Sequence, residues 1–87
     1  MNYRVDWTEE ADRQLAAAWT IADDQTALTV AAQRIEQRLG LDPLTQGEAR
    51  DDFDVRILFD GPPGVVYRVD VFTRTVIVVS VGPSRSR

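Results

Sequence analysis

Cysteine, histidine and lysine are all missing from this 87-residue chain. Without cysteine the chain cannot form disulfides. Without cysteine or histidine it also lacks the usual ligands of zinc and iron, so we expect no metal site and no cofactor. All ten basic residues are arginine. Guanidinium groups bind anions but stay protonated, so these side chains suit anion binding better than proton transfer.

Long apolar runs are missing too. No stretch approaches the ~20 apolar residues of a membrane span, and residues 1–6 carry charges where a signal peptide needs an apolar run. The chain is therefore predicted to be cytoplasmic, with no membrane partner. Apolar residues make up 44% and charged residues 28% of the chain, as in folded soluble proteins. At this length one domain over residues 1–87 is expected.

The net charge of −4 hides an asymmetry between the two parts of the chain. Residues 1–54 carry five arginines and twelve acidic residues, giving −7, while residues 55–87 carry five arginines and two acidic residues, giving +3. The summed field should steer an anionic partner to the second part. The acidic part is interpreted as a solvated helical surface.

The first half of the chain predicts a short strand and two helices. Residues 2–6 alternate as a strand does, and Thr8 can cap a helix over residues 9–21. Asp23 and Asp24 can break the chain and cap a second helix, and Gly40 should lie in the left-handed position beyond its last turn, with Leu41 folding back. The second helix has one apolar stripe, formed by Leu28, Ala31, Ala32, Ile35 and Leu39. Residues 45–52 lack periodicity and are predicted to be a loop.

From residue 53 the apolar period changes to two, which indicates strands. Strands are predicted over residues 53–59, 65–72 and 75–81, and the last of them is almost wholly apolar. The expected fold is α+β with the order β-α-α-β-β-β. A helical hairpin would cover one face of a mostly antiparallel four-stranded sheet.

The turn and the pattern favour a register in which Phe59 faces Val65 and Arg56 faces Arg68. Tyr67 would then lie on the face packed against the helices. The opposite face would be more apolar than solvent requires, which favours binding of a partner there. The predicted partner-binding residues are Leu58, Val66, Phe72, Arg74, Ile77 and Val79.

These segments, in this order and spacing, resemble the RelE/ParE superfamily of toxins from type II toxin–antitoxin systems, also called the plasmid stabilisation family. The resemblance covers nearly the whole chain. It is carried by residues 3–7 and the following 8–11, by residues 41–44 and Gly47, and by residues 55–58, 66–69 and 76–82. It implies a toxin neutralised by a cognate antitoxin that wraps the toxin with a helix and an extended segment.

In the RelE branch, the resemblance implies cleavage of messenger RNA on the ribosome by arginines and a terminal tyrosine or histidine. Arg56 matches a basic position on the second strand, Arg68 lies beyond the position expected on the third, and Arg85 is a shifted substitute after Gly82. These three are the candidate catalytic residues if the chain is a ribonuclease. Asp54 stands where a basic residue is expected, and no terminal tyrosine or histidine follows.

The arginines also have a plainer interpretation, as surface ion pairs of Arg56 with Asp70 and of Arg68 with Asp54. Three functions stay open. The favoured one is a ParE-like toxin that binds DNA gyrase without cleaving nucleic acid. The second is a RelE-like ribosome-dependent endoribonuclease with an atypical arginine set, and the third is a decayed toxin without activity.

Overall fold

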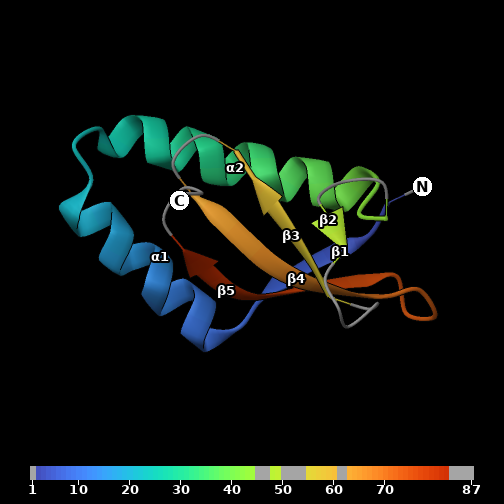
Figure 1. The fold of residues 1–87 in the computed structure, drawn as a ribbon. Coiled ribbons are helices and arrows are strands. Elements are labelled where there is room, and N and C mark those ends of the chain that lie inside the picture. The colour runs from blue at the N-terminus through green and yellow to red at the C-terminus, as the bar shows by residue number, and fades with distance from the viewer. Residues whose placement is uncertain (1, 45–47, 50–54, 61–62, 83–87) are drawn as a thin grey trace.

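A computed structural model describes residues 2–44, 48–49, 55–60 and 63–82 of the chain. The elements follow the predicted order β-α-α-β-β-β, which is confirmed, with one short strand added within residues 45–52 (Figure 1). In chain order they are β1 (Arg4–Trp7), α1 (Glu9–Ile21), α2 (Gln25–Leu41), β2 (Glu48–Ala49), β3 (Val55–Phe59), β4 (Gly64–Asp70) and β5 (Thr75–Gly82).

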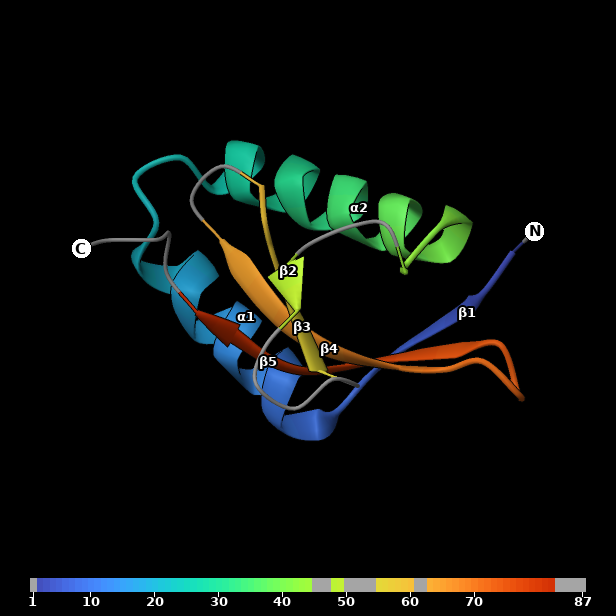
Figure 2. The ribbon, with the colours of Figure 1, turned by 45° about the vertical axis from the view of Figure 1, so that its right-hand side comes forward.

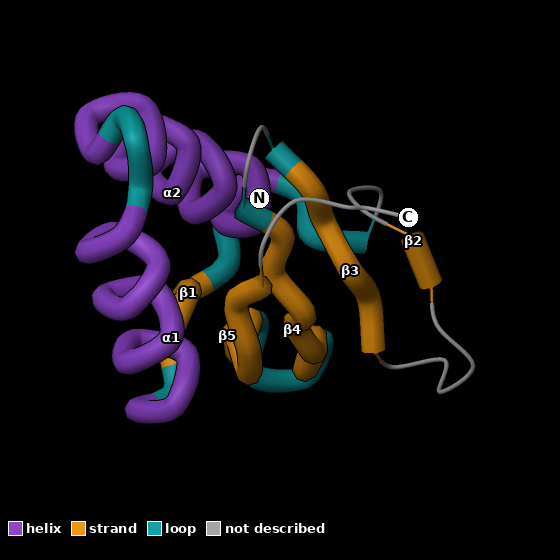
Figure 3. The backbone as a smooth tube through the Cα atoms, turned by 60° about the vertical axis from the view of Figure 1, so that its left-hand side comes forward, coloured by secondary structure: helices purple, strands orange, loops and turns teal. Residues whose placement is uncertain are grey.

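The strands form one mixed sheet in the order β1-β5-β4-β3-β2. β1 runs parallel to β5, and the other neighbours are antiparallel. Both helices lie on the same side of the sheet (Figure 3). The predicted arrangement of a helical hairpin on one face is therefore confirmed. The prediction that residues 45–52 contain no strand is wrong, because Glu48 and Ala49 pair with β3.

The core lies between the helices and the facing side of the sheet. Strands β4 and β5 contribute their alternate residues to it, and each helix contributes an apolar stripe. Burying each large apolar side chain stabilises the fold by about 1.5–3 kcal/mol. The buried cluster consists of Ala11, Ile35, Leu39, Leu58, Val65, Tyr67, Val76, Val78 and Val81. Tyr3, Val5 and Trp7 pack against it together, as the strand pattern predicts.

Both helices begin at the residues that the sequence indicates. The Thr8 side chain accepts a hydrogen bond from the Ala11 N–H at 3.1 Å, and the Asp24 carboxylate accepts one from the Ala27 N–H at 2.9 Å. Each cap satisfies a backbone N–H that has no partner within its helix. The predicted bounds of α1 are confirmed at both ends.

The second helix ends later than predicted. Gly40 is helical, and α2 continues to Leu41, whose side chain is 65% exposed and does not fold back onto the core. A tertiary contact accounts for the difference, since the Tyr3 N–H donates to the Gly40 carbonyl at 2.7 Å. A Cβ at Gly40 would lie 3.5 Å from the Tyr3 carbonyl oxygen. That is an ordinary van der Waals distance, so the approach of β1 to α2 does not itself require glycine at this position.

The register between β3 and β4 differs by one residue from the predicted one. Phe59 pairs with Gly64, Leu58 with Val65, and Arg56 with Tyr67. A Cβ on residue 64 would come within 2.7 Å of two ring carbons of Phe59, so glycine suits the position opposite this ring. A slip of one residue exchanges the two faces of a strand. The faces predicted for the side chains of β3 are therefore wrong.

Strand β5 continues past the end of β1, and α1 covers its free edge. The Thr8 N–H donates to the Val78 carbonyl at 3.0 Å, and the Gln14 side-chain oxygen accepts from the Val81 N–H at 2.7 Å. A β-bulge at Val79 lies between these contacts, because Val66 pairs with Ser80 while Tyr67 pairs with Val78. The bulge returns Val81 to the core side of the sheet.

Asp60, after β3, ties the sheet to α2. Its carboxylate accepts two hydrogen bonds from Arg34, at 3.0 and 2.7 Å, and lies 3.6 Å from an Nη atom of Arg38. Only 13% of the Asp60 side chain is exposed. The hydrogen bond from Arg34 lowers the pKa of Asp60 from its ordinary value. The folded state therefore favours the ionised carboxylate.

Asp60→Asn should lower the stability of the protein at neutral pH, because it removes the charged partner of Arg34 and Arg38. A carboxyl with a lowered folded pKa stabilises the fold above its unfolded pKa of about 4 and loses this effect as the pH falls through the folded value. Urea denaturation at pH 7 and pH 3 should thus show a smaller difference between wild type and variant at pH 3. Asp23→Asn, at an exposed position between the helices, is the control. An equal difference at both pH values would contradict the prediction.

Candidate partner-binding face of the sheet

The face of the sheet away from the helices combines apolar and charged side chains. Alternation places Val66 and Arg68 of β4 on this face, since their neighbours Val65 and Tyr67 are buried on the other. Val66 pairs with Ile57 of β3, and Arg68 pairs with Ile77 of β5. Val66 and Ile77 are only half-buried, whereas Arg68 is exposed. We call this surface the open face.

The structure places the two central arginines on opposite faces. Arg56 pairs with Tyr67 and therefore shares the helix side, while Arg68 lies on the open face. The predicted geometry, in which both guanidinium groups face one phosphate or pair diagonally with acids of one face, is wrong. The cause is the one-residue register difference. Asp54 and Arg85 lie outside the described residues, and the proposed catalytic roles stay predictions.

Leu58 was predicted on the partner-binding face, and this placement is wrong. It is 4% exposed and pairs with the buried Val65 in the core. The placement of Val66, Phe72, Arg74 and Ile77 outside the core fits the prediction, and Val79 is half-buried at the bulge. Their role in binding a partner stays a prediction.

The turn between β4 and β5 presents an aromatic ring to solvent. Phe72 is 96% exposed, and the turn lies at the end of the sheet away from the connection between the helices (Figure 2). The Asp70 carboxylate accepts hydrogen bonds from the N–H groups of Phe72 and Thr73, at 3.0 and 3.2 Å. Arg74 follows with a φ of 54°, in the left-handed region. These contacts hold the turn in a defined shape.

A hollow of about 440 Å³ lies where this turn meets the open face, and Arg68, Asp70, Phe72 and Ile77 line it. Its lining combines an aromatic ring, an aliphatic side chain and charges of both signs. Aromatic residues and arginine are enriched where proteins bind partners. The hollow is therefore a candidate contact point for a partner.

Three solved structures match this fold over most of their length. The RelBE2 toxin–antitoxin complex from Mycobacterium tuberculosis matches with a TM-score of 0.78 and 22% identity, over 100% of this chain and 95% of that chain. The ParDE system of P. aeruginosa matches with a TM-score of 0.68 and 16% identity, over 95% and 97%. The isolated E. coli RelE toxin matches with a TM-score of 0.68 and 20% identity, over 98% and 87%.

The chain has the RelE/ParE fold. These matches extend across the whole chain, as the order and spacing of its segments predicted. No family model matches the sequence, and no curated protein matches it significantly. At identities of 16–22%, the likeness lies in the arrangement of the elements.

Within this RelE/ParE fold, Tyr67 is a core residue, as predicted. Its side chain is fully buried, and its hydroxyl donates to the Pro43 carbonyl oxygen at 2.8 Å. Burial raises the pKa of Tyr67 to about 12, and the positive charge of Arg56 opposes this shift. The phenol is therefore protonated at neutral pH and inaccessible to a substrate, which makes it unsuitable as a general base.

Tyr67→Phe should destabilise the fold by about 1–2 kcal/mol, since it leaves the buried Pro43 carbonyl without its donor. The melting temperature should fall by roughly 4–8 °C for each kcal/mol. Stability linked to a raised phenol pKa is complete below the unfolded pKa of about 10 and falls as the pH rises towards 12. The variant should therefore lose less stability than wild type in alkaline melts. Tyr3→Phe, at a less buried phenol, is the control; equal effects of the two changes would oppose this account.

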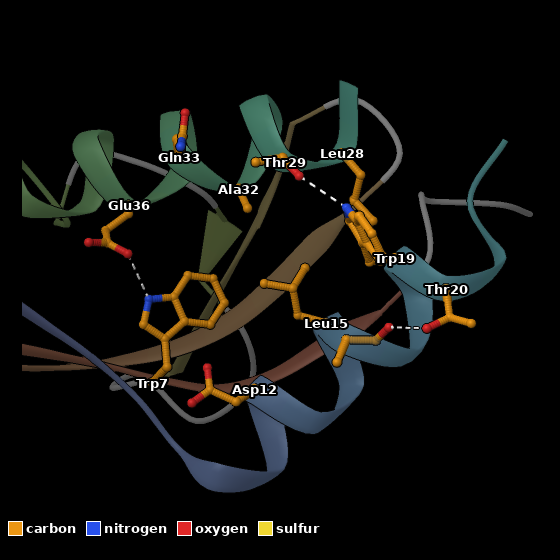
Figure 4. A pocket seen from close by; sticks show the side chains of 11 residues that line it. Trp7, Asp12, Leu15, Trp19, Thr20, Leu28, Thr29, Ala32, Gln33 and Glu36 are labelled. Carbon is orange, nitrogen blue, oxygen red and sulfur yellow. Dashed lines mark hydrogen bonds between the residues drawn. The ribbon is translucent and has the colours of Figure 1, made fainter. Parts of the chain in front are cut away.

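A groove that the sequence did not predict lies between α1 and α2 (Figure 4). Trp7 and Trp19 line it, beside acidic side chains that were interpreted from the sequence as solvated surface. Trp19 is 44% exposed. The available signal was the position of a tryptophan at the end of the apolar stripe of a helix.

The described residues add two observations on chemistry. Nowhere among them do three aspartate or glutamate side chains gather closely enough to hold a metal ion. None of the described helices is both long and apolar enough to cross a membrane.

Proposed function

We propose that this chain is the toxin of a type II toxin–antitoxin pair and acts by binding a cellular target. The observation that supports this most directly is the match over the whole chain to toxins of both the RelE and the ParE type. DNA gyrase, the target implied by the resemblance to ParE, is the favoured one. The cytoplasm is the compartment in which such a target would be met.

Binding is favoured over catalysis because of the placement of the arginines. Cleavage of RNA needs several cationic groups converging on one phosphate, together with an acid and a base. Arg56 and Arg68 lie on opposite faces of the sheet, and the Tyr67 hydroxyl is buried against Pro43. A net charge of −4 also weakens the attraction to RNA.

A cognate antitoxin would neutralise the toxin by covering the open face. Val66 and Ile77 supply apolar surface there, and Phe72 supplies an exposed anchor at the end of the sheet. RelE has been solved in complex with RelB from Mycobacterium tuberculosis and from Pyrococcus horikoshii, which supports a protein partner for this fold.

Inducible expression in bacteria tests the proposal. Expression alone should stop growth, and co-expression with the product of the neighbouring reading frame should restore it. Supercoiling by gyrase and the integrity of messenger RNA are measured in the same cells. Loss of supercoiling without RNA cleavage supports the gyrase-binding function. Unimpaired growth at high expression would contradict it.

The second candidate, a RelE-like endoribonuclease, is supported by the exposed Arg68 and Arg74 near the turn. The double variant Arg56→Ala, Arg68→Ala separates the two functions. A nuclease should lose RNA cleavage and growth arrest together. Persistent growth arrest without RNA cleavage would exclude the nuclease.

A further inference from the structure

A groove of about 530 Å³ runs between α1 and α2, which diverge from their connection at residues 22–24 (Figures 1 and 4). Leu15 and Ala16 of α1 and Leu28 and Ala32 of α2 form its apolar walls. The groove lies on the helix side of the molecule, so it is a different surface from the open face of the sheet. Its size lies within the range of sites that bind ligands or partner side chains.

Two tryptophan rings in the groove are held by hydrogen bonds. The Trp7 indole N–H donates to the Glu36 carboxylate at 3.0 Å, and the Trp19 indole N–H donates to the Thr29 hydroxyl at 3.2 Å (Figure 4). The Thr29 hydroxyl in turn donates to the Gln25 carbonyl at 3.0 Å. Rings fixed in this way lose little conformational freedom when a partner binds. The groove is thus preorganised to accept apolar groups.

The apolar surface extends beyond the groove towards the connection of the helices. Trp19 and Val30 are 44% and 41% exposed, and they line a second hollow together with Thr29. Continuous exposed apolar surface marks sites of interaction with other molecules. The length of this surface along α2 suits an elongated partner segment better than a small ligand.

The charges at the groove select the kind of partner. Its described lining contains two carboxylates, Asp12 and Glu36, and no arginine. The nearby Glu10 is paired with Arg13, so Asp12 and Glu36 supply the charge at the lining itself. A second copy of this chain would bring the same charges to the contact, and a nucleic acid would bring more of them. Opposite charge across the contact favours a cationic occupant.

We propose that this groove binds an amphipathic helical segment of a protein partner that carries arginine or lysine beside its apolar face. Apolar side chains of the segment would enter between Trp7 and Trp19, and its cationic groups would pair with Asp12 and Glu36. This is the helix-in-groove mode of recognition. If the proposed function is correct, the partner is the antitoxin, which would then hold the toxin at two surfaces.

The two tryptophans of the chain both line the groove and report on its occupancy. The probes are two tryptophan-free amphipathic peptides of 18 residues with the same leucine and alanine face, one with arginine and one with glutamate on the polar face. Titration of the full chain with the arginine peptide should change the indole fluorescence saturably. The glutamate peptide should not. Equal binding of both peptides would overturn the charge requirement.

Matched variants locate the binding. Asp12→Asn with Glu36→Gln removes both groove charges while keeping an oxygen that accepts a hydrogen bond from Trp7. This double variant should bind the arginine peptide about tenfold or more weakly than wild type. The control Glu9→Gln with Asp23→Asn removes two charges outside the lining and should lower the affinity for the arginine peptide less than about threefold. Equal weakening would show unspecific attraction and overturn the proposal.

A steric pair tests the groove without changing charge. Ala16→Gln extends a polar side chain into the groove, whereas Ala17→Gln makes the same change at the next exposed position of α1, outside the lining. Only Ala16→Gln should abolish peptide binding, with both variants melting like wild type. Binding that survives Ala16→Gln would overturn the proposal.

In cells, Ala16→Gln and its control Ala17→Gln distinguish the docking site in the groove from the proposed toxin function. If the chain arrests growth, Ala16→Gln should still arrest it but resist rescue by the product of the neighbouring frame, and full rescue would overturn the assignment of the groove to the antitoxin. If the chain does not arrest growth while the arginine peptide still binds as predicted, the proposed function fails and the docking site stands.

Discussion

Leu39→Ala should destabilise the protein by about 2–5 kcal/mol, whereas Leu41→Ala, two residues further along α2, should change stability by no more than about 0.5 kcal/mol. Leu39 is fully buried in the core cluster, and its truncation removes apolar contacts and leaves a cavity. Leu41 is 65% exposed. Both variants replace the same residue type in the last turns of one helix.

Urea denaturation followed by circular dichroism measures both effects. A folded chain of this length has a total stability of roughly 4–13 kcal/mol at the usual 0.05–0.15 kcal/mol per residue, so Leu39→Ala removes a large share. A helix ending at Gly40, with Leu41 folded back, would make the two substitutions similarly costly. Comparable losses for the two would therefore contradict the continuous helix and favour the ending that the sequence predicts.

The helices could be predicted closely because their signals are local. A threonine or aspartate at the N-cap and an apolar stripe at helical spacing lie within one stretch of chain, and both helices begin where these signals stand. The end of α2 could not be predicted in this way. The contact of Gly40 with Tyr3 joins residues that are 37 positions apart in the chain. A local sequence pattern cannot indicate such a contact.

The register of β3 could not be derived because both faces of this strand carry apolar side chains. Val55, Ile57 and Phe59 form the more apolar set, so the pattern assigned them to the core. The structure instead buries Leu58 opposite Val65. Period-two patterns identify a buried face only where the other face is polar. The fold was therefore predictable at the level of element order, while the pairing of strands was not.

The register of β3 also determines which residues of the candidate site share a face. The placement of Val66 and Arg68 on the open face follows from β4, and Ile77 lies on the same face because it pairs with Arg68. Arg56 and Leu58 belong to β3, and both were assigned to the wrong face. The groove between the helices depends on the angle at which α1 and α2 diverge, a tertiary property that helical spacing alone does not contain.

Leu58→Asn is a strong test of the pairing of β3. We expect this substitution to lower the free energy of unfolding by about 4 kcal/mol or more. The change removes apolar contacts from the core and buries an amide where only apolar side chains surround it, so its hydrogen bonds with water are lost. Phe72→Asn is its matched control. Phe72 is 96% exposed in the β4–β5 turn, so the same new side chain should alter stability by about 0.5 kcal/mol at most.

The predicted register placed Leu58 and Phe72 on one partner-binding face, and in that case the two substitutions would both spare the fold and both weaken binding. In the observed register their effects separate. Leu58→Asn should lower the melting temperature strongly, while Phe72→Asn should melt like wild type and lose affinity for the proposed antitoxin. Thermal melts and co-purification with the neighbouring frame's product measure the two effects. A Leu58→Asn protein that melts like wild type would refute the pairing of Leu58 with Val65, and with it the separation of Arg56 from Arg68.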